Sequence, residues 1–359
     1  VTAATPDIVI YLTGSTAFRS VAYAAIASLY NSGFTVNAAN GSGSPFTTIA
    51  NPQAPNRPTA DSLFNEASFV TFSGTMPTFG SQVVAVYCNW GGSVAGLRDV
   101  AQQNTRAFLS TSLSQTSAFT DNGTNAVPDF CLSDVNQTTT VYKSPTLQSV
   151  NFAVVPYVLV KNNGASGTLT NITHQQAQTL FANGVVSLGS ITGDATTGTG
   201  SDTNKVACLI GANNGSGGRA LVFADTGYGA LKSTFNYKYD GTNTFVPVVP
   251  DPNVGYTSVG SIRADLSVSA SQAIGADGST TVTGYALGYL SVKDAYSVTG
   301  NSGGALNLQY DGSAFSTNAV QNGTYTLWGY ERISHRSGIN ANLTSFRGAI
   351  TNALISNAC

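Results

Sequence analysis

The chain has 359 residues, of which 42% are hydrophobic and 10% aromatic, so it carries enough apolar side chains to form a core. A single core rarely serves a chain of this length, and two lobes are therefore expected. Only 9% of the residues are charged, and the formal net charge is −2. This balance excludes a surface for nucleic acid or for an anionic membrane, since both need clustered Lys and Arg.

The composition predicts a secreted protein, periplasmic or extracellular at the cell surface. With so few charges, its surface must consist largely of Ser, Thr, Asn and Gly. No apolar run approaches the roughly 20 residues of a membrane-spanning helix, and the chain begins at Val1, as a mature chain does after signal removal. The four cysteines have no metal-binding spacing, so no metal site is expected. We expect Cys359 to form a disulfide whose partner is open.

Two stretches near the N-terminus have the pattern of a buried strand, a glycine turn and a helix. In the first, the apolar run Ile8–Leu12 leads to the turn Gly14–Phe18, and apolar residues at helical spacing follow. In the second, Val83–Tyr87 leads to Gly91–Arg98, and the helix is predicted to reach about Leu113. Each stretch therefore predicts a βα unit.

Two other segments lack this regularity. The stretch Asn31–Pro77 is rich in turn-forming residues and predicts a long surface insertion with short strands. The stretch Ser233–Thr283 predicts further strands and loops. Long irregular segments in an ordered chain are often functional.

The middle of the chain predicts a crossing between lobes. The short buried strand Val127–Asp134 ends in Ser133 and Asp134, and polar residues at a strand end commonly face a cleft. Asp134 is also compatible with a plain helix N-cap. The apolar strand Val150–Val160 contains Pro156, which central strands rarely accept, so we place the crossing there.

Alternating strands and helices then resume. A third strand and glycine turn, Val206–Ile210 and Gly211–Arg219, repeat the pattern of the first two. Glycines let the backbone approach a ligand, hydroxyls can donate to it, and the first N–H groups of a helix point at the same place. Three such turns predict one anion-binding site, although each alone is also an ordinary structural turn. The remaining predicted elements are a helix from His174 to Phe181, a strand at Gly284–Leu290 and a C-terminal helix at Leu343–Ile355.

The order of these motifs resembles the type II solute-binding proteins of ABC importers, and among them the phosphate-binding branch. The segments that carry the resemblance are Gly14–Phe18, Gly91–Leu97, Ser133-Asp134, Val154–Val160, Ile172–Phe181, Ala286–Tyr289 and Tyr325–Tyr330. The resemblance implies a two-lobed, periplasmic-binding-protein-like α/β fold with mixed sheets and a long, strand-containing insertion. Lobe 1 would comprise residues 1–153 and 298–359, and lobe 2 residues 154–297.

The resemblance also implies a phosphate or similar oxyanion bound between the lobes, without a cofactor. Asp134 would accept the proton of a protonated phosphate, which sulfate does not carry. The family's Arg-x-Asp-Gly-Ser-Gly-Thr motif is changed here to Ala212–Gly218, and Arg219 or Arg98 could supply the missing guanidinium. The implied ligand-binding residues are Ser15, Thr16, Ala17, Phe18, Ser93, Ser133, Asp134, Ser216, Gly217 and Arg219.

Two functions from different classes follow. The first is a binding protein, not an enzyme, that delivers its ligand to the permease of an ABC transporter. Glutamate occurs only at Glu66 and Glu331, so a paired-Glu glycosidase site is not expected. The second is an extracellular subunit that assembles with copies of itself into a filament or surface layer, with Asn31–Pro77 or Ser233–Thr283 at the contacts. Low charge removes the repulsion that opposes such assembly.

Overall fold

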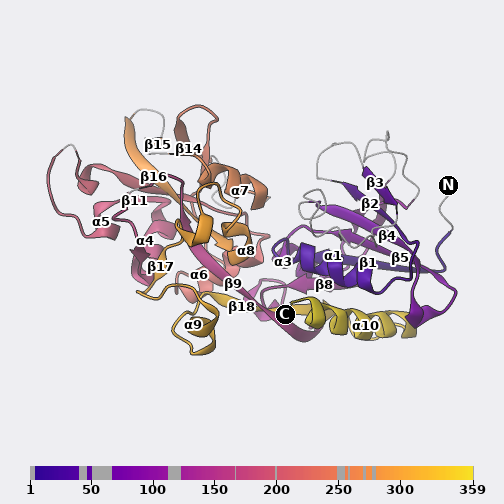
Figure 1. Cartoon of the computed structure of the whole chain (residues 1–359). Helices are drawn as coiled ribbons and strands as arrows, with labels where there is room; N and C mark the ends of the chain where they lie inside the picture. The colour runs from indigo at the N-terminus through magenta and orange to yellow at the C-terminus, as the bar shows by residue number, and fades with distance from the viewer. Residues whose placement is uncertain are drawn as a thin grey trace. The chain divides into compact units, whose positions relative to one another are not determined.

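The computed structural model describes residues 5–39, 47–50, 67–111, 123–165, 167–198, 200–248, 255–257, 259–269, 272–276 and 280–358. The chain forms two compact units (Figure 1). Unit 1 comprises Val1–Val154 and Tyr330–Cys359, and unit 2 comprises Val155–Gly329. Each unit combines a mixed sheet with helices, so the predicted α/β class with mixed sheets is confirmed.

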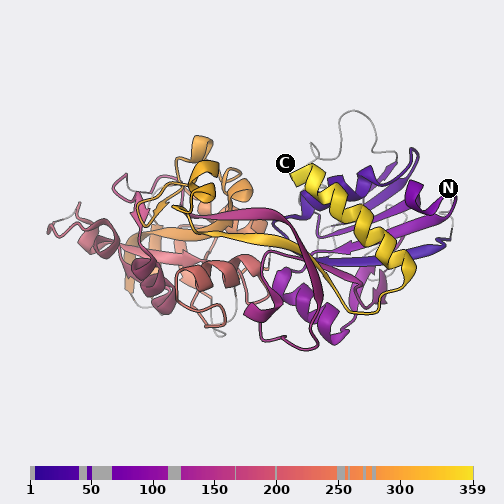
Figure 2. The same ribbon diagram turned by 90° about the horizontal axis from the view of Figure 1, so that it is seen from below.

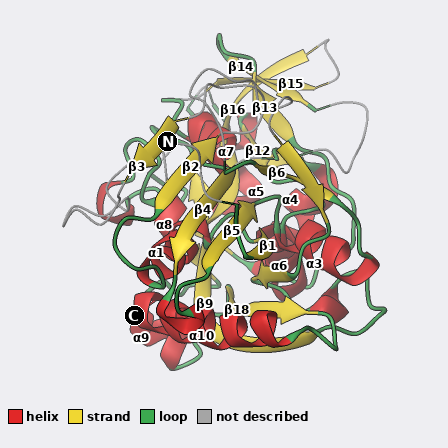
Figure 3. Cartoon of the chain, turned by 90° about the vertical axis from the view of Figure 1, so that its right-hand side faces the viewer, coloured by secondary structure: helices red, strands yellow, loops and turns green. Residues whose placement is uncertain are grey.

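The sheet of unit 1 has parallel strands at its centre. β1 (Ile8–Gly14) lies between β5 (Val83–Asn89) and β8 (Phe130–Ser133) and is parallel to both. These strands are apolar and almost wholly buried, as parallel strands covered on both faces usually are. Antiparallel strands extend both edges, in the order β3-β2-β4-β5-β1-β8-β18. Figure 3 labels β3, β2, β4, β5 and β1 of this series. The antiparallel strands are β3 (Thr47–Ala50), β2 (Thr35–Ala39), β4 (Phe69–Thr75) and β18 (Trp328–His335).

Helices cover both faces of this sheet. α1 (Arg19–Ser28) packs on α10 (Ala341–Ala358) on one face, and α3 (Ser93–Gln102) packs on β1 and β8 on the other (Figure 2). The smaller elements of unit 1 are η2 (Pro77–Phe79), β6 (Arg106–Leu109), β7 (Gly123–Ala126) and η4 (Gln137–Thr139).

Unit 2 is built around the long strand β16 (Thr280–Ser291). It is parallel to β12 (Val206–Ile210) and antiparallel to β15 (Gln272–Ala276) and to β9 (Gln148–Lys161), the strand in which the chain enters the unit. The other strands are β10 (Asn171–Ile172), β11 (Val185–Ser187), β13 (Tyr237–Tyr239), β14 (Thr244–Pro247) and β17 (Gln309–Tyr310). The helices are α4 (His174–Asn183), α5 (Gly189–Thr192), η5 (Asp202–Asn204), α6 (Gly217–Asp225), α7 (Val259–Leu266), α8 (Val292–Ala295), η6 (Ser302–Gly304) and α9 (Thr317–Gln321).

The return of the chain to unit 1 comes later than the expected residue 298. The segment before Tyr330 is bound to unit 2 by backbone hydrogen bonds: Leu308 N donates to Leu159 O over 2.8 Å, and Tyr157 N donates to Leu327 O over 2.8 Å. These long-range bonds connect residues far apart in the sequence, so local pattern could not reveal them.

Two predicted elements also differ. α3 ends at Gln102 rather than near Leu113, because Gln103 adopts a left-handed conformation (φ 57°) and the chain turns into β6. In the stretch expected to be β-rich, residues 259–266 form α7. The expected insertion Asn31–Pro77 contributes β2, β3 and β4 to the sheet of unit 1, and residues 40–46 and 51–66 lie outside the described ranges.

Candidate functional site

The carboxyl ends of β1, β5 and β8 meet at one edge of the unit 1 sheet, because the three strands are parallel neighbours. Hydrogen bonds tie together the turns that follow them. Ser15 N donates to Leu132 O over 2.8 Å, and Gly92 N donates to Gly14 O over 2.9 Å. Ligands of open parallel sheets commonly bind at this edge.

A third bond closes this arrangement. Asp134 N donates to the Ser93 hydroxyl over 3.3 Å, so the start of α3 is held against the end of β8. Ser15, Ser93, Ser133 and Asp134 are all buried, with exposures of 0–3%. The structure therefore brings these four predicted residues together within unit 1.

The predicted residues that follow Ser15 in the first glycine turn have different surroundings. Thr16 and Ala17 are partly exposed, whereas Phe18 is buried and packs edge-to-face on Phe152, with their ring centroids 5.3 Å apart. The Ser133 hydroxyl donates to Val135 O over 3.0 Å, which supports the chain direction after β8.

The helices that begin at this edge have no side-chain caps. The N-cap residues of α1 and α3 are Phe18 and Gly92, and neither makes a side-chain capping bond. By contrast, α4 and α6 are capped by Thr173 and Ser216. The helix dipole favours negative charge at a helix start, where anions commonly bind.

Close packing explains one of the glycines of the α3 turn. A Cβ on Gly96 would lie 2.7 Å from Cys131 Sγ and 2.9 Å from Gly14 Cα. Any larger residue would push α3 away from β1 and β8. Gly96 thus positions the start of α3, including Ser93, over the strand ends.

A buried ion-pair cluster supports the same turn. Asp99 is 1% exposed, and its carboxylate oxygens lie 2.7 Å from Arg98 Nε and 2.7 Å from Arg106 Nη1. The Arg106 guanidinium packs against Gly91, where a Cβ would collide with it. Arg98, a predicted alternative guanidinium, is therefore engaged with Asp99. Arg106 was not predicted, and no local pattern marks it.

The carboxyl edge of the unit 1 sheet also holds a carboxyl group that was not among the predicted ligand-binding residues. Glu331 on β18 is 0% exposed, and neither of its carboxyl oxygens has a hydrogen-bond partner among the described residues. Burial raises the pKa of Glu331 well above its ordinary value, and the charge of Asp134 raises this pKa further. The Ser15 hydroxyl and Arg332 act in the opposite direction on the pKa. β18 also contains Arg332, Ser334 and His335, so no local pattern marked Glu331.

The third predicted turn belongs to unit 2. The Ser216 hydroxyl accepts a hydrogen bond from Arg219 N over 3.3 Å and so caps α6, which Gly217 begins. The Arg219 side chain is 3% exposed and runs along the helix: its Cζ lies 5.1 Å from the centre of the Phe223 ring, and Nη2 donates to Lys232 O over 3.0 Å. The Ser216 hydroxyl therefore has a structural role, whereas Arg219 Nε and Nη1 have no hydrogen-bond partner among the described residues.

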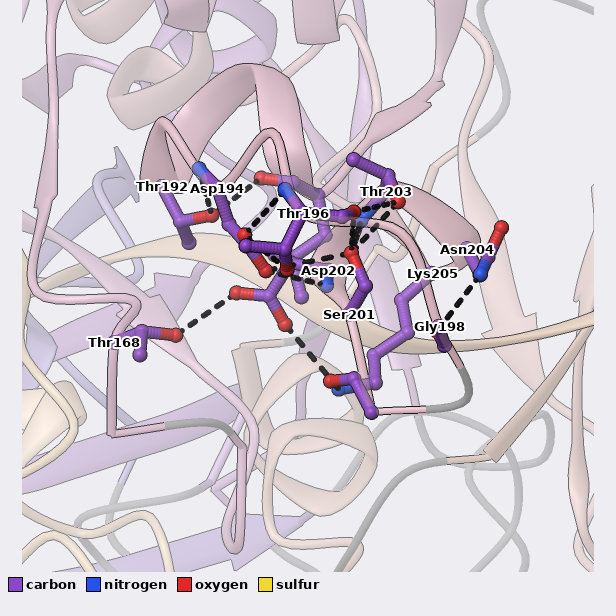
Figure 4. A network of polar contacts seen from close by, with 12 residues as sticks. Thr168, Thr192, Asp194, Thr196, Gly198, Ser201, Asp202, Thr203, Asn204 and Lys205 are labelled. Carbon is purple, nitrogen blue, oxygen red and sulfur yellow. Dashed lines mark hydrogen bonds and ion pairs between the residues drawn. The ribbon is translucent and has the colours of Figure 1, made fainter.

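A second polar cluster in unit 2 orders the loop between α5 and β12 (Figure 4). Asp194 accepts bonds from the backbone and hydroxyl of Thr196 and from Asp202 N, at 2.7–2.9 Å. These bonds lower the pKa of Asp194 to about 2. Asp202 accepts in turn from Thr168 over 2.9 Å and from Lys205 over 3.2 Å. Every interaction shown is internal to the loop and its neighbours, which indicates a structural role.

The described residues include no group of three or more His, Cys, Asp or Glu that could hold a metal ion. Cys88, Cys131 and Cys208 are buried free thiols, and Cys359 lies outside the described residues. The structure therefore gives no support to the expected disulfide. None of the described helices is long and apolar enough to span a membrane.

No protein-family model and no curated protein sequence matches the chain. The solved structures to which the chain is similar include several phosphate-binding proteins. One is an ABC-type phosphate transport receptor from Vibrio cholerae (TM-score 0.45, 15% identity, covering 97% of this chain and 98% of that one). Another is a phosphate-binding protein from Stenotrophomonas maltophilia (TM-score 0.45, 13% identity, 96% and 83% covered). A third is a high-affinity periplasmic phosphate-binding protein with bound phosphate (TM-score 0.46, 11% identity, 98% and 90% covered).

Proposed function

We propose that the chain is a binding protein for phosphate or a closely related tetrahedral oxyanion, and that the ligand contacts the carboxyl edge of the unit 1 sheet. The observation that carries this proposal is the pair of uncapped helix starts, α1 and α3, beside the buried Ser15 and Ser93. Both helices direct their positive dipole ends toward that edge. This is the arrangement that favours bound anions.

Asp134 gives the proposed site its selectivity. It is 3% exposed and follows β8 at the same edge, where its backbone is held by Ser93. An ionised carboxylate accepts a hydrogen bond from the protonated oxygen of phosphate. Sulfate carries no proton, so its oxygen and the carboxylate oxygen would face each other as two acceptors. The proposed site therefore prefers phosphate to sulfate.

Calorimetric titration of the purified protein with phosphate and with sulfate tests this function. We expect phosphate to bind in preference to sulfate. Replacing Asp134 by Asn should weaken phosphate binding about 10- to 150-fold, because a hydrogen bond to a charged group contributes about 1.5–3 kcal/mol. It should improve the relative binding of sulfate. Asp240→Asn in an exposed turn of unit 2 is the matched control and should change neither affinity.

The absence of heat with either anion, in folded protein over a range of concentrations, would contradict the proposed function. Tight phosphate binding that is unaffected by Asp134→Asn would instead contradict the role of Asp134. The wider proposal is a secreted protein that passes phosphate to the permease of an ABC importer, and copurification with such a permease would test it. The alternative of a self-assembling subunit gains no support, since β2, β3 and β4 of the expected contact segment are paired within the sheet of unit 1.

A further inference from the structure

We propose that Glu331 is a second ligand-binding carboxyl of this site, and that it donates a hydrogen bond to the bound oxyanion as a neutral acid while Asp134 accepts one. This inference rests on the proposed function. It assigns a role to a residue outside the glycine turns.

Strand register brings the two carboxyls together. β18 is antiparallel to β8, with Arg332 opposite Ser133. Continued by one residue past Ser133, this register sets Asp134 opposite Glu331. The effect of the Asp134 charge on the pKa of Glu331 agrees with this placement. Directly opposed residues of antiparallel strands have Cβ atoms about 4.5–5.5 Å apart, within reach of a common ligand.

The surroundings of Glu331 favour a neutral carboxyl. Its side chain is fully buried, and its two oxygens have no hydrogen-bond partner among the residues that the structure describes. An ionised carboxylate in such a place carries a large desolvation cost, so the group retains its proton instead. Ser15 Oγ is also buried and makes no well-formed hydrogen bond in the described part of the chain, although it lies near enough to Glu331 for weak hydrogen bonding to lower the pKa of Glu331. Two polar groups at one edge thus retain hydrogen-bonding capacity that an oxyanion could satisfy.

The charged and titratable groups around Glu331 agree with this assignment. The charges of Asp134, just past β8, and of Arg332, the next residue on β18, act on Glu331, and Glu331 in turn raises the pKa of the Cys131 thiol. Burial and the charge of Asp134 raise the pKa of Glu331, against the smaller opposing effects of Ser15 and Arg332. Arg332 Nη1 donates to Tyr330 O over 2.8 Å. The neighbouring turns supply Ser15 and Ser93, which carry no charge.

The two carboxyls would then have separable roles. A neutral acid donates equally well to phosphate and to sulfate, so Glu331 supplies affinity without selectivity. Asp134 supplies the selectivity, because it needs a proton on the ligand. Ionisation of Glu331 at higher pH would remove the donor and set a second negative charge against the anion, so affinity should fall.

Sulfate binding reports the ionisation of Glu331 without a contribution from ionisation of the ligand, because sulfate has no proton to lose at neutral pH. The test compares sulfate binding by Asp134→Asn and by Asp134→Asn/Glu331→Gln across a pH series. Glutamine keeps a neutral donor and nearly the same volume. With Glu331 intact, sulfate affinity should fall about tenfold per pH unit above the pKa of Glu331, as expected for one linked proton. Because a glutamine side chain does not titrate, the double variant should bind sulfate with little pH dependence.

A second variant keeps the test informative if the glutamine variant folds poorly. Glu331→Leu removes the donor and should weaken phosphate and sulfate binding by similar factors, about tenfold or more for one lost charge-assisted bond. Circular dichroism of each variant checks the fold. Two results would contradict the role of Glu331 and leave the proposed function standing. One is sulfate binding with the same pH dependence in Asp134→Asn and in Asp134→Asn/Glu331→Gln. The other is a Glu331→Leu variant whose affinities for phosphate and sulfate are unchanged. If the wild type binds neither anion at any pH, the proposed function and this inference both fail.

Discussion

The Asp134 amide donates a hydrogen bond to the Ser93 hydroxyl over 3.3 Å, although the two residues are 41 positions apart. This bond joins the end of β8 to the start of α3. The N-cap residue of α3 is Gly92, which has no side chain with which to cap the helix. The Asp134 backbone is therefore held at a helix start that no side chain caps.

Replacing Ser93 by Ala should destabilise the protein by about 1–3 kcal/mol, because the buried Asp134 amide loses its acceptor. Urea unfolding measures this change. Ser28→Ala is the control: its hydroxyl donates within α1 to Ala25 O, and Ala is a better helix former, so stability should change little. Equal effects of the two substitutions would show that the bond to Asp134 contributes nothing measurable.

Replacing Gly96 by Ala should destabilise the protein by about 1–3 kcal/mol, since the new methyl group would overlap Cys131 Sγ and Gly14 Cα. Gly348→Ala in α10 is a matched control, because a Cβ there meets nothing within 4 Å and the helix gains up to about 1 kcal/mol. Thermal unfolding should therefore shift in opposite directions for the two variants. A stabilising Gly96→Ala would mean that α3 does not depend on close approach to β1 and β8.

Replacing the three members of the ion-pair cluster, Asp99, Arg98 and Arg106, should lower the stability of the protein to different extents. Asp99→Ala leaves Arg106 without its buried partner and should cost about 3–5 kcal/mol. The Arg98 side chain is 40% exposed and the Arg106 side chain only 18%, so Arg98→Ala should cost less than Arg106→Ala. Chemical unfolding of the three variants gives the order, and a larger loss for Arg98→Ala would contradict it.

Glu331 should make stability fall as pH rises. Below its ordinary pKa of 4.5, the folded and unfolded chains both hold the proton, and the group adds no pH dependence to stability. Above 4.5 the unfolded chain loses the proton while the raised pKa keeps it in the folded chain, so stability falls until the folded pKa is reached. Glu331→Gln should remove this loss and become more stable than the wild type by about 1.4 kcal/mol per pH unit within that window.

Unfolding by urea at a series of pH values measures this difference. Asp194→Asn provides a contrast of opposite sign, because hydrogen bonds lower the pKa of Asp194 to about 2. The stabilisation from Asp194 is present above the ordinary value of 3.8 and is lost as pH falls through about 2. If Glu331→Gln showed no pH-dependent difference from the wild type, Glu331 would have an ordinary pKa.

The three described cysteines should react slowly with alkylating reagents in the folded protein. Cys88, Cys131 and Cys208 are each 0% exposed, and burial raises the pKa of each thiol, which lowers the fraction of reactive thiolate. Mass spectrometry after alkylation without reductant should find these three thiols modified only in denaturant. Fewer than three modified thiols in the denatured, unreduced protein would reveal a disulfide that involves one of them.

The sequence by itself determined the elements that depend on short-range pattern. The apolar runs that become β1, β5 and β12 and the glycine turns after them are visible within a few residues, as is Thr173, which caps α4. Together with the resemblance that their order carries, the same patterns predicted two α/β units with mixed sheets. They also singled out Ser15, Ser93, Ser133 and Asp134, because polar residues that follow parallel strands share one edge of a sheet.

The tertiary structure alone decided what depends on contacts between distant segments. The pairing of β18 with β8 sets Arg332 opposite Ser133 and so brings Glu331 near Asp134, and strand register over such a separation has no local signature. The late return at Tyr330 depends on bonds from Leu308 and Leu327 to β9, which form only after the chain has folded back. The pKa of Glu331 is likewise a property of its burial, since the same side chain in an unfolded segment would ionise near 4.5.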